Sequence, residues 1–339
     1  MKYTIEEYLL NEYNASSKAR KDISHFVLQD GFRSIFKFDK TKAYRHKTAK
    51  LLLALILCAK ILMLKKDDIL FVQTSLTVLR TILRIKAFRR FKLIYLVHDL
   101  YSLKYNTAES RRIHAEEISK DVSTLSQCDF VIVHNERMVQ GLERYGCRSR
   151  LISLGIFDYA CSLPPRARAL GVGEKAGVAF AGYLGKADFL RKLDETSHES
   201  FSMIIYGIPE MPAKNSTYMG SVDADILPGV IEGHFGLIWE DGYHACPTDN
   251  YMCINNPHKL SMYIVAGLPV IAWAKSAAAL FVEANNIGIT VDSLDELDGR
   301  IKCISPESYS VMVNNCLAIR RKLIRGGYLR EALKQIQVS

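Results

Sequence analysis

Short apolar runs alternate with longer helical segments along most of this chain, and this alternation restricts the fold more than any other feature. In the first half, strands are predicted at residues 33–38, 69–73, 93–98 and 130–134, with helices at 17–29, 47–64, 76–88 and 108–126. Three of these strands are almost continuously apolar, as parallel strands covered on both faces are. The pattern predicts an α/β fold with a doubly wound parallel sheet.

The alternation restarts after a looser stretch rich in Pro, Gly and charge. The second set of predicted strands lies at residues 178–181, 203–206, 235–239, 270–273 and 289–291. A chain of 339 residues suits two domains. We therefore expect an N-terminal Rossmann-like domain over 1–157, a linker over 158–176 and a C-terminal Rossmann-like domain over 177–305. An outer helix over 306–339 either stays with the second domain or crosses back to the first. Two such sheets would face each other across a cleft, where ligands of this fold bind.

The positive charge of the chain is concentrated in its first half. Residues 1–150 contain 28 Lys/Arg and 16 Asp/Glu, a net charge of +12, whereas the rest of the chain carries −3. Such an excess suits an anionic partner: a membrane surface, a pyrophosphate-linked acceptor or nucleic acid. Scattered surface cations that only keep the protein in solution explain it too. Because no nucleic-acid recognition motif is present, no nucleic-acid partner is expected.

No secretion signal or membrane span is predicted, so a cytoplasmic protein is expected. The most apolar run, residues 51–64, is too short to cross a bilayer and contains Lys60, which predicts a buried helix. The eight cysteines form no Cys-x-x-Cys pair and are expected to be reduced thiols. Residues 80–92 are basic and amphipathic. They either lie on an anionic membrane, making the protein peripheral, or pack on the core with a basic solvated face.

Residues 255–273 read as a polar loop, a helix, a tight turn and a buried strand. Free N–H groups and the positive end of the macrodipole at a helix N-terminus attract phosphate. Pro257 suits the first turn, and Asn256, His258 and Lys259 add polar groups at the same end. An ordinary α/β unit without a ligand has the same pattern.

Two further polar segments flank predicted helices and suit a phosphate or a sugar. Gly182 to Lys186 follows an apolar strand, so that the backbone could approach a diphosphate and Lys186 could meet its charge. Ser17 and Lys18 open an early helix beside other cations. A tight strand–helix turn and a capped, solvated helix start are the plain alternatives.

His98 and Asp99 close a strong predicted strand. A carboxylate at the carboxyl end of a central strand lies where doubly wound folds carry out chemistry, and it can remove a proton from an attacking hydroxyl. An aspartate that caps the next loop is the alternative.

Other patterns point away from metals and from familiar nucleotide motifs. Asp223 and Asp225 superficially match a metal-binding aspartate pair, but their context favours a turn. His244, Cys246, Cys253 and His258 are zinc-ligand types whose spacing fits no tight zinc knuckle, so no metal is expected. Without Gly-x-Gly-x-x-Gly or a P-loop, nicotinamide dehydrogenase and P-loop ATPase functions are disfavoured.

Eight segments, in order and across both predicted domains, carry a family resemblance. They are SKARKD (17–22), VHDL (97–100), VIVHN (131–135), IFDY (156–159), FAGYL (180–184), YMGSVDA (218–224), FGLIWEDG (235–242) and INNPHKLSMYIVAGLPVIAW (254–273). The chain thereby resembles bacterial glycosyltransferases of GT-B architecture. It is most similar to the β-1,6-galactofuranosyltransferases of O-antigen assembly and less so to the glucosyltransferases that extend sugars on serine-rich adhesins.

The resemblance implies an inverting, metal-independent transfer of a hexosyl group, best assigned as galactofuranose, from a UDP-sugar to a glycan hydroxyl. It needs no cofactor beyond that co-substrate. Donor binding falls to the C-terminal domain and acceptor binding to the N-terminal one. Asp99, with His98, matches the catalytic pair. The positions implied at the donor phosphates are Gly182, Lys186, Asn256, His258 and Lys259; those implied at sugar hydroxyls are Ser17, Lys18, Asp158, Glu240 and Asp241.

Two departures and several alternatives remain. The second aspartate of the Asp223/Asp225 pair is not part of the family pattern, which favours a structural role for it. Where many GT-B enzymes carry a ribose-binding glutamate, this chain has Ser261 and Met262, which leaves the ribose contact unassigned. The expected acceptor is a polyprenyl-diphosphate-linked glycan at the inner membrane face, in cell-surface polysaccharide assembly. Glucosyl transfer to a protein-linked sugar and a non-catalytic nucleotide-sugar-binding subunit are alternatives, and a homo-oligomer stays open.

Overall fold

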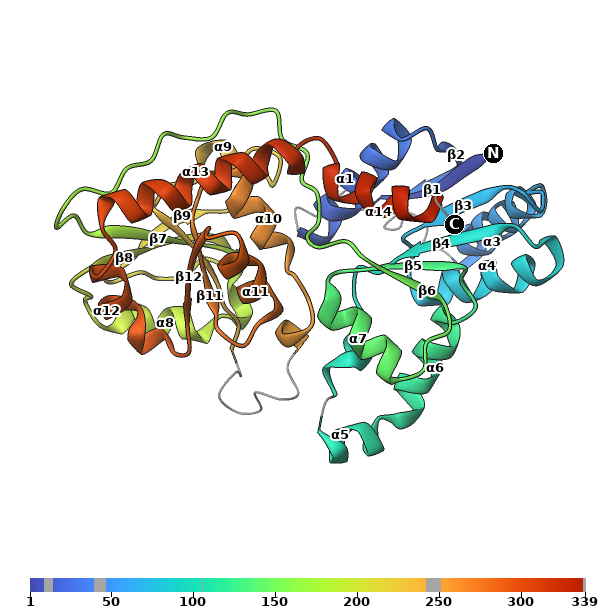
Figure 1. The fold of residues 1–339 in the computed structure, drawn as a ribbon, viewed down its shortest axis with the longest axis horizontal. Helices are drawn as coiled ribbons and strands as arrows, with labels where there is room; N and C mark the ends of the chain where they lie inside the picture. The colour runs from blue at the N-terminus through green and yellow to red at the C-terminus, as the bar shows by residue number, and fades with distance from the viewer. Residues whose placement is uncertain (9–14, 40–46, 106, 242–250, 338–339) are drawn as a thin grey trace. The chain divides into compact units, whose positions relative to one another are not determined.

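The chain folds into two compact units, each built on one parallel sheet (Figure 1). The computed structural model describes residues 1–8, 15–39, 47–105, 107–241 and 251–337. The N-terminal unit contains the described residues of Met1–Gly155 and Gly326–Ser339, and the C-terminal unit those of Ile156–Arg325.

The N-terminal unit has a six-stranded sheet in the order β2-β1-β3-β4-β5-β6, with all pairs parallel. Its strands are β1 (Lys2–Tyr8), β2 (Arg33–Asp39), β3 (Ile69–Val72), β4 (Lys92–Leu96), β5 (Phe130–Val133) and β6 (Arg150–Ser153). Its helices are α1 (Ala15–Gln29), α3 (Lys47–Leu62), α4 (Leu76–Arg89), the 3₁₀ turn η1 (Tyr101–Lys104), α5 (Ala108–Ile113), α6 (Ala115–Leu125), α7 (Glu136–Arg144) and α14 (Gly327–Gln337).

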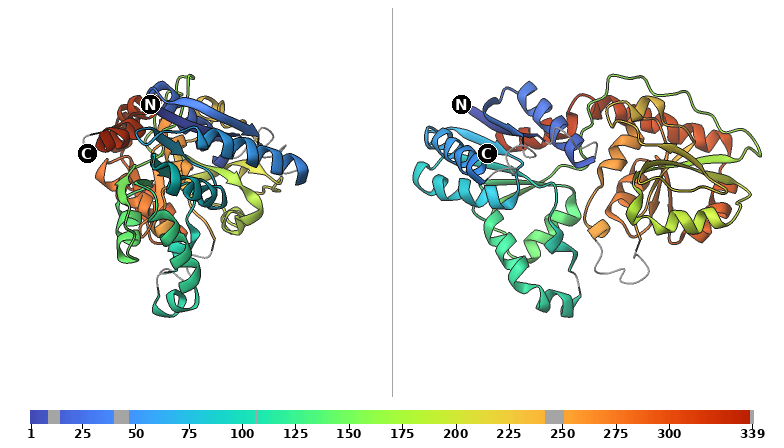
Figure 2. Two further views of the ribbon diagram at one scale, coloured as in Figure 1. Left: turned by 90° about the vertical axis from the view of Figure 1, so that its right-hand side faces the viewer. Right: turned by 180° about the vertical axis from the view of Figure 1, so that it is seen from behind.

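The C-terminal unit repeats this plan with the strand order β12-β11-β10-β7-β8-β9, again all parallel. Its strands are β7 (Ala176–Tyr183), β8 (Phe201–Ile208), β9 (Thr217–Gly220), β10 (Phe235–Ile238), β11 (Val270–Trp273) and β12 (Gly288–Val291). Its helices are η2 (Leu184–Lys186), α8 (Asp188–Glu195), α9 (Leu227–Val230), η3 (Tyr251–Cys253), α10 (His258–Val265), α11 (Ala277–Ala284), η4 (Leu294–Glu296), α12 (Leu297–Lys302) and α13 (Pro306–Leu323). Helices cover both faces of this sheet (Figure 2).

These two sheets confirm the predicted doubly wound α/β fold. The central strands β5, β10 and β11 are buried along their length, and β4 is buried after its exposed first residue, Lys92, as the apolar runs indicated. Three strands were absent from the prediction. β1 carries Glu6 and Glu7, both buried, so its polar sequence did not resemble a strand. β6 and β9 are short edge strands with mixed burial.

The long segment between β6 and β7 lies on the C-terminal unit although it forms neither helix nor strand. The Arg168 guanidinium donates to three main-chain carbonyls of that unit: those of Ile231 at 2.8 Å, Ala266 at 3.3 Å and Gly233. One arginine therefore satisfies carbonyls at the ends of two helices and anchors the segment.

The final helical run is two helices. α13 ends at Leu323, and Gly326 then takes a φ of +70°, where a Cβ would come within 2.6 Å of the Phe26 ring. α14 packs on α1 and β6 of the N-terminal unit, where Arg330 reaches Asp30 at 3.7 Å and Arg150 donates to the Gln335 carbonyl at 3.0 Å.

The expectation of a fully buried helix at residues 51–64 is wrong. One face of α3 is buried through Leu57 and Ile61, and Leu64 just after the helix is buried too, but Leu51 and Leu55 on the opposite face are 62% and 59% exposed. In the neighbouring basic segment, α4 buries Leu79, Ile82 and Leu83 in the core. Whether its basic face also meets a membrane stays a prediction. No helix among the described residues is long and apolar enough to cross a membrane.

Candidate functional site

In the C-terminal unit the strand order reverses between β7 and β10, and the carboxyl ends of these strands hold the densest group of predicted residues. The two strands pair only at their start. Beyond that point the Tyr263 hydroxyl of α10 lies between them, accepting from the Ala181 N–H at 3.0 Å and donating to the Leu237 carbonyl at 3.2 Å. Gly236 makes room for the ring, because a Cβ there would lie 2.3 Å from Tyr263. This wedge fixes α10 against both strand ends.

Lys259, in the first turn of α10, projects over the end of β7. Its ammonium lies 3.9 Å from the centroid of the Phe180 ring, a cation–π contact. A Cβ on Gly182 would come within 2.7 Å of the same Nζ, so the glycine leaves the space that the amine occupies. Burial lowers the Lys259 pKa to about 8, opposed by the charge of Glu240.

Glu240 follows β10 and faces the same point from the other strand. Its pKa is raised by desolvation, and the charges of Lys259 and Lys186 act against that rise. Lys186, in η2, is exposed to solvent. The site therefore combines two cations with one carboxylate, and the cations come from β7's end and from a helix N-terminus. Such a group can hold a dianionic diphosphate and accept hydrogen bonds from a sugar hydroxyl.

The N-terminal turn of α10 has no side-chain cap, because Pro257 occupies the N-cap position and offers no acceptor. The His258 ring stacks on Tyr159 at 4.8 Å between centroids and meets Phe157 edge-on at 6.2 Å. Asn256 is 3% exposed. The predicted phosphate-binding turn is thus held by an aromatic contact with the segment that leads into this unit.

Two other candidates of the same unit, Asp241 and Asp158, and the neighbouring Ser261 have structural surroundings of their own. Both carboxylate oxygens of Asp241 accept from main-chain N–H groups at the start of α8, from Asp188 at 2.5 Å and from Phe189 at 3.0 Å, which is a helix cap. Asp158 is completely buried. Ser261 is buried and donates to the Phe157 carbonyl at 2.5 Å. The roles proposed for Asp158 and Asp241 at sugar hydroxyls stay predictions.

In the N-terminal unit, His98 lies in a defined hydrogen-bond chain at the carboxyl ends of β3 and β4. Its Nε2 is 2.7 Å from Oε1 of Gln73. The Gln73 amide nitrogen donates to the Arg20 carbonyl at 2.9 Å and to Ser24 Oγ at 2.8 Å. Because Oε1 is therefore the acceptor, His98 Nε2 must carry the hydrogen.

Asp99 follows His98, and part of the residue is exposed to solvent while the surrounding protein desolvates its carboxyl. Desolvation raises the pKa of its carboxyl, and the charge of Arg20 lowers it. Burial lowers the pKa of the neighbouring His134 to about 4, so that this ring is neutral and its Nε2 donates to the His98 carbonyl at 2.9 Å. The arrangement presents a carboxylate of raised basicity at a strand end, as a general base requires.

The two candidates on α1 have different surroundings. Lys18 is 4% exposed and forms a buried ion pair with Asp22, with its Nζ 2.5 and 2.6 Å from the two carboxylate oxygens. Ser17 is half-buried. The predicted sugar contact of Lys18 would require this buried pair to open, so it stays a prediction.

The two groups of possible metal ligands, Asp223 with Asp225 and the zinc-type His/Cys set, can be checked only in part. Asp223 Oδ1 accepts from the Asp225 N–H at 2.7 Å, which is the turn that the sequence favoured. No group of three or more His, Cys, Asp or Glu side chains that could hold a metal ion occurs within the described ranges. His244 and Cys246 of the zinc-type set lie outside them.

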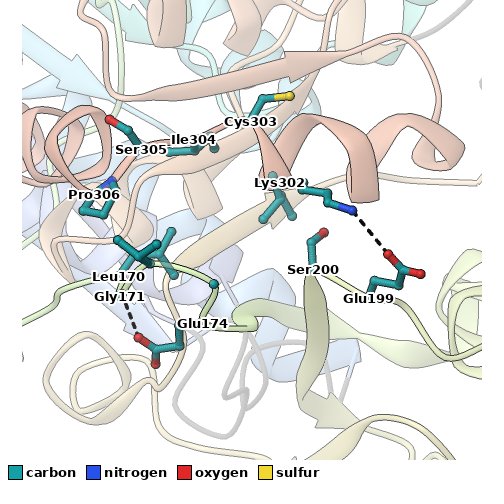
Figure 3. A pocket seen from close by; sticks show the side chains of 13 residues that line it. Leu170, Gly171, Glu174, Glu199, Ser200, Lys302, Cys303, Ile304, Ser305 and Pro306 are labelled. Atoms are coloured by element: carbon teal, nitrogen blue, oxygen red, sulfur yellow. Dashed lines mark hydrogen bonds and ion pairs between the residues drawn. The ribbon is translucent and has the colours of Figure 1, made fainter.

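A hollow of about 510 Å³ lies near the amino ends of β7 and β8 in the C-terminal unit (Figure 3). Its walls come from residues before β7, β8 and α13, including Gly171, Ser200 and Ser305. Lys302 and Glu199 form an ion pair at 3.4 Å on its rim. Because ligands of this fold bind at the carboxyl ends of the strands, this hollow is not the candidate site.

Sequence reasoning missed three residues that organise these sites. Gln73 orients His98, Arg20 acts on Asp99, and Tyr263 joins β7 to β10. Only Arg20 had a signal, since it lies within the basic SKARKD segment. The other two act through contacts between elements that no local pattern reveals.

Comparison with known proteins identifies relatives over both units. The model of the glucosyltransferase 3-like N-terminal domain matches residues 2–156, and that of the C-terminal domain matches residues 178–336. The β-1,6-galactofuranosyltransferase WbbI of Escherichia coli K12 is 30% identical over 255 residues, which are 73% of this chain and 72% of that protein. Glucosyltransferase 3 of Streptococcus parasanguinis is 21% identical over 246 residues, 72% and 69% of the two chains.

Solved structures show the same fold at low sequence identity. HepE from Anabaena, solved with UDP-glucose, has a TM-score of 0.66 at 14% identity, and all of both chains are covered. Sucrose-phosphate synthase from Thermosynechococcus elongatus has a TM-score of 0.61 at 13% identity, covering 100% of this chain and 98% of that one. The architecture is that of the GT-B glycosyltransferases, as the sequence resemblance implied.

Proposed function

We propose that this chain, which belongs to the glucosyltransferase 3-like family of glycosyltransferases, moves a hexosyl group from a UDP-sugar to a hydroxyl of a glycan. The observation that carries the proposal is the group of Lys259, Lys186 and Glu240 at the carboxyl ends of β7 and β10. UDP-glucose in the structure of HepE supports a nucleotide donor.

Donor binding is assigned to the C-terminal unit. The diphosphate charge would be held by Lys259, Lys186 and the positive end of the α10 macrodipole. Gly182 leaves room for the Lys259 ammonium, so the phosphates would meet that cation beside the end of β7. Glu240 is suited to accept from a hydroxyl of the ribose or the sugar.

The chemical step is assigned to Asp99 of the N-terminal unit. Its carboxylate takes the proton of the acceptor hydroxyl, the oxygen attacks the anomeric carbon, and the bond from that carbon to the UDP oxygen breaks. Attack opposite the leaving group inverts the configuration. Lys259 and Lys186 stabilise the charge that develops on the departing diphosphate, which is the role a metal fills in other transferases, so we propose a metal-independent reaction.

The transferred sugar is proposed to be galactofuranose, because the galactofuranosyltransferase WbbI matches this chain at 30% identity. The acceptor is proposed to be a polyprenyl-diphosphate-linked glycan at the cytoplasmic face of the membrane, in cell-surface polysaccharide assembly. The glucosyltransferase 3 proteins of Streptococcus favour a second candidate, glucosyl transfer to a protein-linked sugar.

The experiment that tests the proposal measures UDP release with UDP-galactofuranose, UDP-galactose and UDP-glucose, each with and without lipid-linked and peptide-linked glycans. Acceptor-dependent release from UDP-galactofuranose, undiminished by EDTA, is expected. Release from UDP-glucose alone would favour the second candidate. No release from any donor, with UDP still bound, would identify a non-catalytic binding subunit and contradict the proposal.

A further inference from the structure

Helix α3 is apolar on two opposite faces, and only one of them is used by the fold. Leu57 and Ile61, with Leu64 just after the helix, are at most 6% exposed and belong to the core. At 100° per residue, the exposed Leu51, Leu55 and Leu62 of this same stretch lie on the opposite side. A helix that is apolar all round is normally buried all round, so the outer face lacks a partner within the described structure.

The outer face is a continuous stripe and not a set of scattered side chains. We define the α3 outer face as seven exposed apolar residues: five on α3, one directly after it and one on the adjoining α4. They are Leu51 (62% exposed), Leu52 (59%), Leu55 (59%), Ile56 (39%), Leu62 (49%), Met63 (73%) and Phe88 (83%). α3 and α4 lie side by side (Figure 1), and Arg89 of α4 donates to the Leu64 carbonyl at 3.0 Å, which joins their ends. Contiguous exposed apolar surface of this kind marks an interaction site.

Cations surround this stripe. Lys60, Lys65, Lys66, Arg84 and Arg90 are all exposed. Between residues 47 and 92 the sequence has 11 Lys/Arg and only two acidic residues, Asp67 and Asp68. Asp68 is buried and binds the N-terminal ammonium at 2.8 Å, so it does not offset the surface charge. An apolar stripe with a cationic margin is complementary to a surface that is apolar inside and anionic outside.

We propose that the α3 outer face docks this protein on an anionic lipid bilayer, with α3 lying in the plane of the interface. Its leucines and Phe88 enter the boundary between headgroups and acyl chains, and the lysines and arginines bind lipid phosphates. With 16 residues, α3 is about 24 Å long, too short and too charged at its ends to span. The docking surface therefore centres on α3, with α4 contributing mainly its basic exposed side and Phe88.

The charge of the face selects a membrane over a second copy of the chain. Two copies meeting through the α3 outer face would place the same cations opposite one another, and like charges across an interface are unfavourable. A bilayer with anionic lipid neutralises these cations and covers the leucines at once. The inference complements the lipid-linked acceptor proposed above, but it is tested without any sugar transfer, so either can fail alone.

Flotation of the purified full chain with vesicles tests the proposal. The wild type is expected to bind vesicles of phosphatidylcholine and phosphatidylglycerol and to bind pure phosphatidylcholine much more weakly. A triple variant, Leu51→Ser, Leu55→Ser and Leu62→Ser, should weaken binding at least tenfold, because the three changes remove three leucine side chains from the interface. Lys65→Glu with Lys66→Glu should weaken it by about fivefold or more per cation.

A matched control replaces exposed apolar residues of the C-terminal unit, Leu280→Ser with Val311→Ser, which are 49% and 47% exposed. The control should bind as the wild type does, and circular dichroism should show all variants folded. Equal vesicle binding by the triple variant, or none by the wild type, would overturn the proposal. So would a wild-type dimer that dissociates in the triple variant while neither protein binds vesicles, since that identifies a second copy as the occupant.

Discussion

The surroundings of Lys259 make the charge of its amine depend on pH and on whether a ligand is bound. The amine is packed over the Phe180 ring and beside Gly182, and its burial lowers the pKa to about 8. A bound diphosphate would favour the protonated form and raise that pKa again. The same burial that costs the free protein some stability strengthens each electrostatic contact with a ligand.

The affinity for UDP should therefore fall as pH rises through about 8, because the amine loses its charge above its pKa. A weakening of about tenfold between about pH 7 and pH 10 is expected from the loss of one charged contact. Calorimetric titration of UDP over this range measures it. Lys259→Arg keeps its charge throughout and should flatten the profile; a wild-type profile that is already flat would contradict the assignment.

Arg20 and Asp99 provide a second test at this scale. Since Arg20 lowers the pKa of the Asp99 carboxyl, Arg20→Gln should raise it. The base would then be protonated at higher pH, so the acid limb of the kcat/KM profile should move to higher pH. Lys21→Gln, an exposed cation on the same helix, is the control and should leave the limb in place.

At the scale of elements, the position of α10 depends on one hydroxyl. Tyr263 supplies partners for an N–H and a carbonyl of two strands that have already separated, and Gly236 leaves room for its ring. The helix that carries Lys259 is thereby tied to the ends of β7 and β10.

Tyr263→Phe should lower the free energy of unfolding by about 1–3 kcal/mol, because it leaves the Ala181 N–H and the Leu237 carbonyl buried without partners. Urea unfolding followed by circular dichroism measures the change. Tyr183→Phe removes a hydroxyl from a side chain that is 60% exposed and should be nearly neutral. Equal stability of the two variants would show that the hydroxyl is not needed.

The sequence predicted the elements that obey one simple rule. Strands covered on both faces, such as β5 and β11, are almost purely apolar and were found directly. β1 was missed because Glu6 and Glu7 are buried in it, which is the reverse of the usual pattern. α3 was assigned to the core because an apolar helix is usually buried, and sequence periodicity cannot show that one face has no partner.

At the scale of the whole molecule, the sequence placed candidate residues at strand ends but did not reveal their contacts. The ends of buried strands can be recognised in the sequence, so Asp99, Gly182 and Glu240 were placed correctly at the carboxyl ends of their strands. Gln73 and Tyr263 were not found, because their roles depend on which strands are neighbours and on how a helix packs over them. Sequence could not show either that Asp241 caps α8.

The two units are proposed to divide the work, with the general base in one and the donor site in the other. Asp99→Asn keeps the size of the side chain but cannot accept the proton, so turnover should fall by on the order of 10²–10⁴-fold. UDP affinity should be unchanged, because Asp99 belongs to the N-terminal unit. Steady-state UDP release measures the first quantity; substantial retained turnover would rule out Asp99 as the base.

The affinity of the full chain for UDP, compared between the wild type and Lys259→Ala, tests the central claim most directly. Calorimetric titration at neutral pH should show UDP binding to the wild type and an affinity at least tenfold lower in the variant, with the fold intact by circular dichroism. Equal affinity in the two proteins would contradict the donor site assigned to the carboxyl ends of β7 and β10.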